Sequence, residues 1–140
     1  MQTTHKTISV RTNRRCQMMD ITAQVAEAVA ESGVQNGTVL VFCPHTTAAI
    51  TINENADPDV QHDLLLTLEE LLPKNRPGYR HSEGNSDAHV KTSLVGANEL
   101  VMIENGRLKL GTWQSVFFCE FDGPRTRRVH IQVTGTSSHR

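Results

Sequence analysis

The sequence has 140 residues, which leaves room for one hydrophobic core and not for two, so we expect a single domain over residues 1–140. Hydrophobic residues make up 37% and charged residues 21%, a composition that is typical of a globular protein and excludes a disordered chain. The net charge of −1 excludes a general polyanion binder, which carries a clearly basic face, so nucleic acid is not an expected partner.

The chain shows no signal for a membrane or for secretion. No stretch approaches the run of about 18 apolar residues that a membrane span needs, and residues 1–6 lack the apolar core of a secretory signal. The cysteines Cys16, Cys43 and Cys119 are odd in number and have no CxxC spacing, so we expect them to be buried and reduced. These features favour a cytoplasmic protein with no membrane partner.

The first third of the chain predicts two strands followed by a helix. Thr4 to Val10 alternates polar and apolar residues, and residues 15–19 continue as a second strand after a turn. Asp20 then caps a helix that Gly33 ends. Between these two positions, apolar residues recur at helical spacing: Ile21, Val25, Ala28 and Val29.

Two short strands and a longer helix come next. Residues 38–42 and 48–52 predict strands on either side of Cys43-Pro44-His45. A helix begins at Asp57-Pro58, because Asp can cap free N–H groups and Pro fits the first helical position, and Pro73 ends it. Its apolar stripe predicts a face turned toward a core: Val60, Leu64, Leu68 and Leu71.

Residues 74–86 have no periodicity and predict a long loop, and such loops in compact domains are more often functional than accidental. A short helix follows over residues 87–94, capped by Ser86 or Asp87 and stopped at Gly96.

The last third predicts strands. A hairpin follows residues 100–104 at Asn105-Gly106, and a long strand over residues 113–121 is apolar on both faces at its middle, which implies burial on both sides by a core or a neighbouring subunit. Residues 127–134 alternate cleanly as a final strand before a polar tail, residues 137–140. The elements together predict an α+β domain with a mostly antiparallel, sandwich-like sheet and two to three helices.

The common catalytic motifs are absent from the chain: it has no phosphate-binding P-loop, no GxGxxG after a strand, no HExxH and no GxSxG. What remains is a set of three histidines at loop and strand ends, His45, His81 and His89. Imidazole is the commonest neutral ligand for Zn²⁺ and related ions, and three protein ligands with one open position is the catalytic arrangement. We expect the other histidines to be surface groups outside the site: His5, His62, His130 and His139.

Polar residues near these histidines have several possible roles. Asn85, Asp87 and Glu54 could supply a fourth ligand, orient the ligands, or act as an acid–base pair. Asp57 is expected to cap its helix, which leaves Glu54 as the better functional candidate of its segment.

Polar residues at the ends of the long strand also need partners. Gln114 and Glu120 stand at the two ends of a strand that is buried on both sides, which favours a site or an interface. Arg125 and Arg127 share parity with the apolar residues of the final strand, so an unpaired guanidinium there would be costly. A carboxylate such as Glu120, or a bound phosphate, would resolve that cost.

Several ordered segments, taken together, resemble the YjbQ-like family, also called the secondary thiamine-phosphate synthase family, over nearly the whole chain. The segments are His45-Thr46-Thr47-Ala48-Ala49-Ile50, Asn53-Glu54, Asp57-Pro58-Asp59-Val60, His81 with Asn85, Ala88-His89, Gly111-Thr112-Trp113-Gln114 and Glu120-Phe121-Asp122-Gly123-Pro124-Arg125.

The resemblance implies a compact α+β fold assembled as a homotrimer, with the site near subunit boundaries. It implies a metal site at His45, His81 and His89, with zinc favoured by the imidazoles and magnesium or another transition ion as alternatives. It also implies a weak thiamine-phosphate synthase activity, which joins a pyrimidine diphosphate to a thiazole phosphate and releases pyrophosphate.

The leading hypothesis is therefore a metal-dependent transferase acting on a phosphorylated small molecule. In it Arg125 receives the diphosphate, and Glu54 or Glu120 handles protons or orientation. Two alternatives stay open: a metal-dependent hydrolase, and a trimer that binds a small molecule or metal without catalysis.

Overall fold

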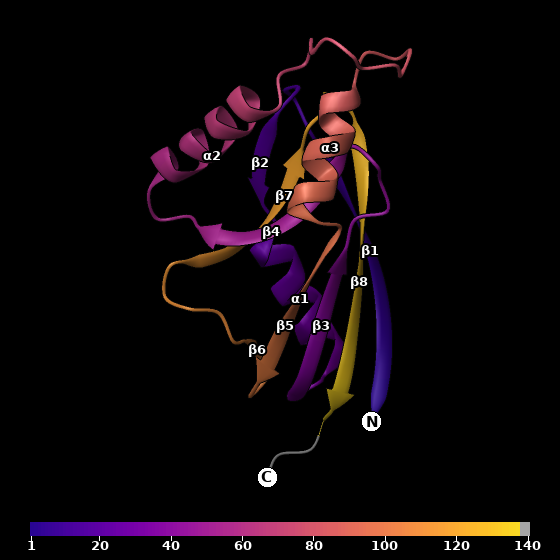
Figure 1. Ribbon diagram of the computed structural model, residues 1–140. Coiled ribbons are helices and arrows are strands. Elements are labelled where there is room, and N and C mark those ends of the chain that lie inside the picture. Colours follow the sequence, from indigo (N-terminus) through magenta and orange to yellow (C-terminus); the bar gives the residue numbers. More distant parts are fainter. Residues whose placement is uncertain (138–140) are drawn as a thin grey trace.

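The computed structural model describes residues 1–137, so His139 and most of the expected polar tail lie outside the described residues. Residues 1–137 form three helices, α1 (Thr22–Ser32), α2 (Pro58–Leu71) and α3 (Ser86–Val95) (Figure 1). The strands are β1 (Gln2–Arg11), β2 (Gln17–Asp20), β3 (Asn36–Phe42), β4 (Ala48–Glu54), β5 (Asn98–Glu104), β6 (Arg107–Leu108), β7 (Gln114–Glu120) and β8 (Thr126–Thr136).

The strands form two sheets in which every pairing is antiparallel. One sheet has the order β1-β8-β3-β5-β6 and the other β2-β7-β4. Helix α1 lies against the larger sheet, and α3 lies beside β4 (Figure 1). The main hydrophobic core is enclosed between the larger sheet, α1 and the smaller sheet. The predicted α+β class with a mostly antiparallel sheet is confirmed.

Strand β7 is the central strand of the smaller sheet and is covered on both faces, as its sequence predicts. Val116 and Phe118 belong to the main core, while Phe117 and Cys119 belong to a second, smaller cluster. Successive side chains of β7 thus pack alternately into two separate cores. The strand begins at an exposed residue, Gln114, and ends at a fully buried one, Glu120.

The local signals for helix ends and turns are largely confirmed. Asp20 accepts a hydrogen bond from the backbone N–H of Thr22 at 2.8 Å, and Gly33 ends α1 with φ of 73°. Asp57 caps α2 by accepting from the N–H of Asp59 at 2.9 Å. One expectation is wrong: α3 is preceded by Asn85 rather than capped by Ser86 or Asp87. The Asn85 side chain makes no cap bond: its Oδ1, which would have to accept from a helix N–H, has no partner, and its amide N–H donates to Asp122.

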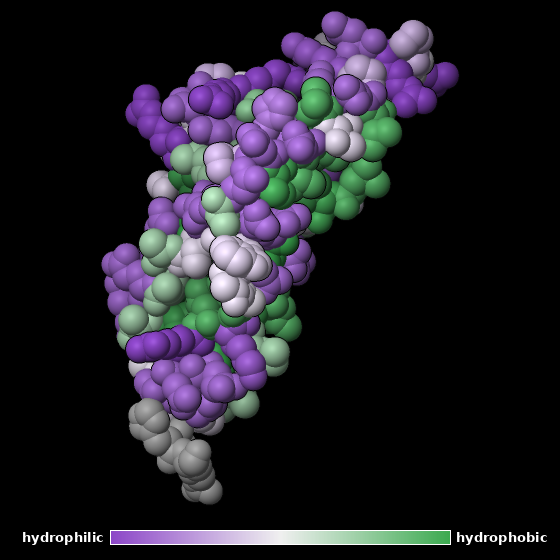
Figure 2. All heavy atoms as spheres, turned by 90° about the vertical axis from the view of Figure 1, so that its left-hand side faces the viewer, coloured by the Kyte–Doolittle hydropathy of each residue, from purple (hydrophilic) through white to green (hydrophobic). Residues whose placement is uncertain are grey.

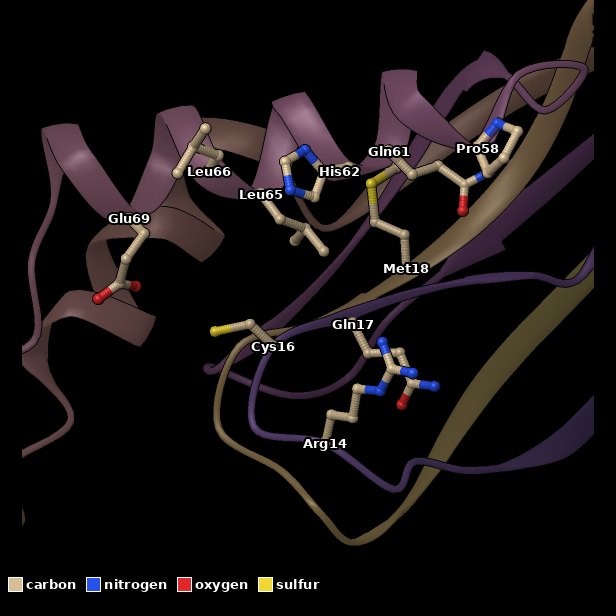
Figure 3. A pocket seen from close by; sticks show the side chains of 10 residues that line it. All are labelled: Arg14, Cys16, Gln17, Met18, Pro58, Gln61, His62, Leu65, Leu66 and Glu69. Carbon is tan, nitrogen blue, oxygen red and sulfur yellow. The ribbon is translucent and has the colours of Figure 1, made fainter.

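The expected core-facing stripe of α2 is also wrong in part. No residue of α2 is buried in the single chain, and Leu71 is 65% exposed. Only Leu65 and Leu68 pack against the smaller core cluster, because a groove of about 560 Å³ separates the rest of the helix from residues 14–18 (Figure 3). Helical spacing identifies the apolar face of a helix but not how much of that face is covered.

The cysteines are free, and Cys43 and Cys119 are buried, as expected; the expectation is wrong for Cys16, which is only partly buried because it lines the groove beside α2. Burial raises the pKa of Cys119 to about 12, so its thiol stays protonated and unreactive. None of the helices within residues 1–137 is long and apolar enough to span a membrane.

Candidate functional site

His45, His81 and His89, which lie far apart in the sequence, line one pocket of about 420 Å³. Four segments meet there: the β3–β4 connection, the loop over residues 72–85, the start of α3, and the turn between β7 and β8. The lining residues are Pro44, His45, Thr46, Thr47, His81, Glu83, Asn85, His89, Asp122, Arg125 and Arg127. The three histidines therefore line the same pocket, but among the described residues they are not grouped around one point.

His45 is held by the backbone of β8. The N–H of Arg128 donates to its Nε2 at 2.9 Å. Burial lowers the pKa of His45, and the positive charge of Arg127 lowers this pKa further. A ring nitrogen that accepts an N–H carries no proton, so Nε2 is the unprotonated nitrogen of His45 in this structure.

His81 and His89 face each other from the loop and from the first turn of α3. Their ring centroids are 5.2 Å apart with the rings nearly perpendicular, at 86°. The Nε2 of His81 also lies 3.7 Å from an oxygen of Glu83. Two imidazoles and a carboxylate therefore line the same part of the pocket.

The donor set suits a metal ion in its chemistry, although the described residues contain no group of three His, Cys, Asp or Glu already arranged around one point. Imidazole nitrogens suit zinc and other transition ions. The buried Oδ1 of Asn85 has no hydrogen-bond partner, and a cation or an N–H group of a ligand would satisfy it. His81, His89 and Asn85 are the residues that could hold an ion, and the His45, His81, His89 triad stays a prediction.

Asn85 and Arg125, both candidates from the sequence, meet at Asp122. Asn85 donates its amide N–H to Asp122 Oδ2 at 2.7 Å, and a guanidinium nitrogen of Arg125 donates to the same oxygen at 3.1 Å. The Nε–H of Arg125 donates to the Asp122 carbonyl at 3.0 Å. The Arg125 side chain is 50% exposed, so its guanidinium is accessible to an anionic ligand.

Glu120 lies behind the pocket and is fully buried. Its carboxylate accepts two hydrogen bonds from Arg127, one from the Thr12 hydroxyl at 2.8 Å and one from the Asp122 N–H at 3.0 Å. Burial alone would raise the pKa of Glu120, but these hydrogen bonds outweigh it and lower that pKa. Glu120 is thus a fixed carboxylate that orients its neighbours, and it does not line the pocket.

Arg127 connects this carboxylate to the His45 segment. Its guanidinium donates to the Thr47 hydroxyl at 2.9 Å and to the Thr47 carbonyl at 3.3 Å. The Thr47 carbonyl also accepts from the Phe121 N–H at 3.2 Å. The expectation that a buried arginine would find Glu120 is confirmed for Arg127 and wrong for Arg125, which is half-exposed and pairs with Asp122. We call the group Thr12, Thr47, Glu120 and Arg127 the buried wall.

Glu54 and Gln114 are not brought to the histidines within one chain. They pair with each other at one end of the β4–β7 ladder, and the pocket lies near the other end, where Ala48 pairs with Glu120. Six residues of strand separate the two ends, which is about 20 Å at ~3.3 Å per residue. Gln114 instead accepts a hydrogen bond from the Gly111 N–H at 2.7 Å.

A second buried ionic group fixes α3. Asp87 and Lys91 are fully buried and joined at 2.8 Å, and Arg15 reaches Asp87 at 2.9 Å. Lys91 also contacts Glu69 of α2 at 2.8 Å. Burial would raise the pKa of Asp87, but the hydrogen bonds from Arg15 and Lys91 outweigh it and lower the pKa to about 2. These residues hold the helix that carries His89.

Sequence reasoning missed several pocket residues. Glu83 and Asp122 line the pocket, and both fall inside segments that the sequence singled out, so their position was the available signal. The Arg128 contact uses a backbone N–H, which no residue pattern can reveal.

The fold and the pocket define a class: small α+β proteins with two antiparallel sheets and a histidine-lined pocket between their loops. A family model described as UPF0047 protein YjbQ-like matches residues 6–136. The chain belongs to the YjbQ-like UPF0047 family.

Relatives from bacteria and archaea agree with this assignment. UPF0047 protein YugU of Bacillus subtilis is 53% identical over 130 residues, covering 93% of this chain and 98% of that protein. A UPF0047 protein of Methanocaldococcus jannaschii is 50% identical, covering 90% of this chain and 91% of that protein.

Solved structures of the family share the fold. A YjbQ/UPF0047 protein of Clostridium acetobutylicum is 54% identical with a TM-score of 0.91, covering 92% of this chain and 99% of that one. A protein of Sulfolobus solfataricus, described as of unknown function, is 34% identical with a TM-score of 0.92, covering 96% and 99%. The names of these relatives state a family and no activity, so the function has to be argued from the pocket.

Proposed function

We propose that the protein is a metal-dependent transferase that acts on phosphorylated small molecules in the histidine-lined pocket. The observation that carries the proposal is that three histidines and Arg125 line one cavity. The reaction to test first is the one that the family resemblance implies. In it a carbon of the pyrimidine substrate bonds to the ring nitrogen of a thiazole phosphate, while its bond to the diphosphate oxygen breaks and pyrophosphate leaves.

Each group of the pocket has a place in this reaction. The accessible guanidinium of Arg125 binds phosphoryl oxygens and offsets the charge that develops on the leaving diphosphate. His81 and His89 would hold a divalent ion, which would supply a Lewis acid for the same oxygens. The imidazoles favour zinc, since magnesium prefers carboxylate, phosphate and water oxygens.

A homotrimer in the cytoplasm is part of the proposal. Large hydrophobic side chains are exposed on α3 and β5, among them Leu94, Leu100 and Met102, each at least 60% exposed. Hydrophobic side chains reach the surface along the right-hand edge of Figure 2. Exposed apolar surface of this kind marks contact surfaces, and further copies of the chain in a trimer would cover it.

The first test compares His89→Ala with His62→Ala. His62 is an exposed histidine on α2 outside the pocket, so it is a matched control. Elemental analysis of purified protein and a coupling assay with the pyrimidine diphosphate and thiazole phosphate give the readouts. We expect His89→Ala to lose both metal and coupling activity while His62→Ala keeps both. Wild-type protein without bound metal or turnover after purification from metal-supplemented medium would refute the proposal.

One observation favours a second candidate, a metal-dependent phosphate-ester hydrolase. His81 Nε2 lies 3.7 Å from Glu83, and a carboxylate beside an imidazole can orient it to remove a proton from water. A panel of phosphate esters incubated with zinc-loaded protein separates the candidates: release of inorganic phosphate without coupling supports the hydrolase. No turnover on either assay, with zinc bound, supports a binding protein.

A further inference from the structure

His45 differs from the other two pocket histidines in what its ring already contacts. Strand β3 ends at Phe42, which pairs with His130 of β8, so no strand residue is opposite Arg128 on that side. The Nε2 of His45 takes the place of the missing strand partner and accepts the Arg128 N–H at 2.9 Å. The ring therefore completes the edge of a sheet.

This contact decides which ring nitrogen carries the proton. A neutral imidazole has one N–H donor and one accepting nitrogen, and a nitrogen that accepts a backbone N–H must be the unprotonated one. The proton of His45 is then on Nδ1, which has no hydrogen-bond partner among the described residues. Neither nitrogen offers a free lone pair to a metal, because Nε2 uses its lone pair on Arg128 and Nδ1 carries a proton.

A metal at either ring nitrogen of His45 would therefore break the hydrogen bond from the Arg128 N–H, which is solvent-exposed. Further contacts hold the arrangement in place. Arg127, next along β8, binds Thr47 through two hydrogen bonds, so the segment that carries His45 is fixed to the same strand at two positions.

We infer that His45 is not a metal ligand but a fixed hydrogen-bond donor, whose Nδ1–H binds an oxygen of a phosphoryl group in the pocket. The inference rests on the proposed function in so far as the pocket binds a phosphorylated ligand. Arg125 and Arg127 line the same cavity as the carboxylates Glu83 and Asp122, and the half-exposed guanidinium of Arg125 is the cation that an anionic ligand could reach there. His81 and His89, whose ring nitrogens accept no backbone N–H among the described residues, remain the imidazoles available to a metal.

The position of the ring proton is the first test and needs no ligand. Long-range ¹H–¹⁵N correlation spectra of wild-type protein with ¹⁵N-labelled histidine identify which nitrogen of each neutral ring is protonated. We expect the His45 proton on Nδ1, and we expect zinc to shift the ring signals of His81 and His89 but not the amide signal of Arg128. A proton on Nε2, or loss of the Arg128 hydrogen bond on zinc addition, overturns the inference.

Two substitutions then separate donation from metal binding. His45→Asn places an amide N–H near the position of Nδ1, whereas His45→Ala removes the donor. We expect both variants to keep the zinc stoichiometry of the wild type, while His89→Ala loses zinc. For inorganic pyrophosphate as the probe, calorimetry should show His45→Ala binding about tenfold to hundredfold more weakly, the loss expected for one hydrogen bond to a charged group. His45→Asn should recover most of that affinity.

The two proposals fail in different ways. If the wild type binds zinc and pyrophosphate but His45→Ala and His45→Asn both lose zinc, the inference is wrong and the proposed function stands. If His45→Ala binds pyrophosphate as tightly as the wild type, the donor role is also wrong. If the wild type binds neither zinc nor pyrophosphate, the proposed function is wrong, and the proposed role of His45 in binding a phosphoryl group is then wrong as well.

Discussion

The two sides of the pocket are built in opposite ways. The buried wall fixes the segment that carries His45, and its charged and polar side chains are almost completely enclosed, each with several hydrogen-bond partners. The loop over residues 72–85 contains no helix or strand, and it presents His81 with 43% of its side chain exposed. Substitutions on the buried wall should therefore change stability first, and substitutions in the loop should change ligand binding first.

The largest effect on stability is expected from Arg127→Met. The substitution leaves the Glu120 carboxylate buried without its cationic partner, which typically costs about 3–5 kcal/mol of folding free energy. Urea unfolding measures the loss. Arg128→Met is the matched control, because that side chain is exposed and its backbone N–H is retained, and it should change stability by less than about 0.5 kcal/mol. Equal free energies of unfolding for the two variants would show that the buried wall does not stabilise the His45 side of the pocket.

Asp87→Asn should have the next largest effect. Lys91 is fully buried and keeps only Glu69 as an anionic partner after this change, so we expect a loss of about 2–3 kcal/mol. Asp63→Asn on α2 is the control, since Asp63 is 74% exposed. Thermal unfolding of the two variants decides the point, and a loss in Asp63→Asn as large as in Asp87→Asn would contradict it.

Acid should lower the free energy of unfolding by about as much as Asp87→Asn does, or by less. The pKa of Asp87 is lowered from 3.8 to about 2, so the unfolded state binds a proton more readily than the folded state. The stability from this group is complete above pH 3.8 and is lost as the pH falls through about 2, on the order of 2 kcal/mol. Glu120, whose pKa is also lowered, acts in the same direction. Urea midpoints between pH 5 and pH 2 measure the slope, and Asp87→Asn should flatten it.

The smallest effect on stability is expected from His81→Ala. An exposed loop side chain contributes within about 0.5 kcal/mol of zero. Its urea midpoint should match that of His62→Ala, but of these two variants only His81→Ala should lose zinc. A large loss of stability in His81→Ala would mean that the loop is as much a part of the packing as the buried wall.

The fold could be predicted from local patterns to a large extent, because alternation, caps and turn residues act over short distances. The Asn105-Gly106 turn shows why: both residues have positive φ, 53° and 74°, which the hairpin requires and which this residue pair tolerates. The covering of α2 could not be predicted in the same way, since it depends on where other elements of the fold lie.

The candidate site was predictable in its residues but not in their roles. His45, His81, His89, Asn85 and Arg125 do line one cavity, whereas Glu54 and Gln114 lie at the far end of their strands. Residue type indicated chemistry at all seven positions. Only the folded chain shows that Glu120 is sealed behind the pocket and that a backbone N–H occupies one nitrogen of His45.

The strand order of the larger sheet also sets when the protein can fold. Strand β8, near the end of the chain, lies between β1 and β3, and residues 2–11 have no other partner in the sheet. A ribosome therefore releases nearly the whole chain before this sheet can close. Pairing between strands so distant in sequence forms slowly and leaves apolar strands exposed for longer. The newly made chain can therefore bury Val39 and Val41 only after its synthesis is nearly complete.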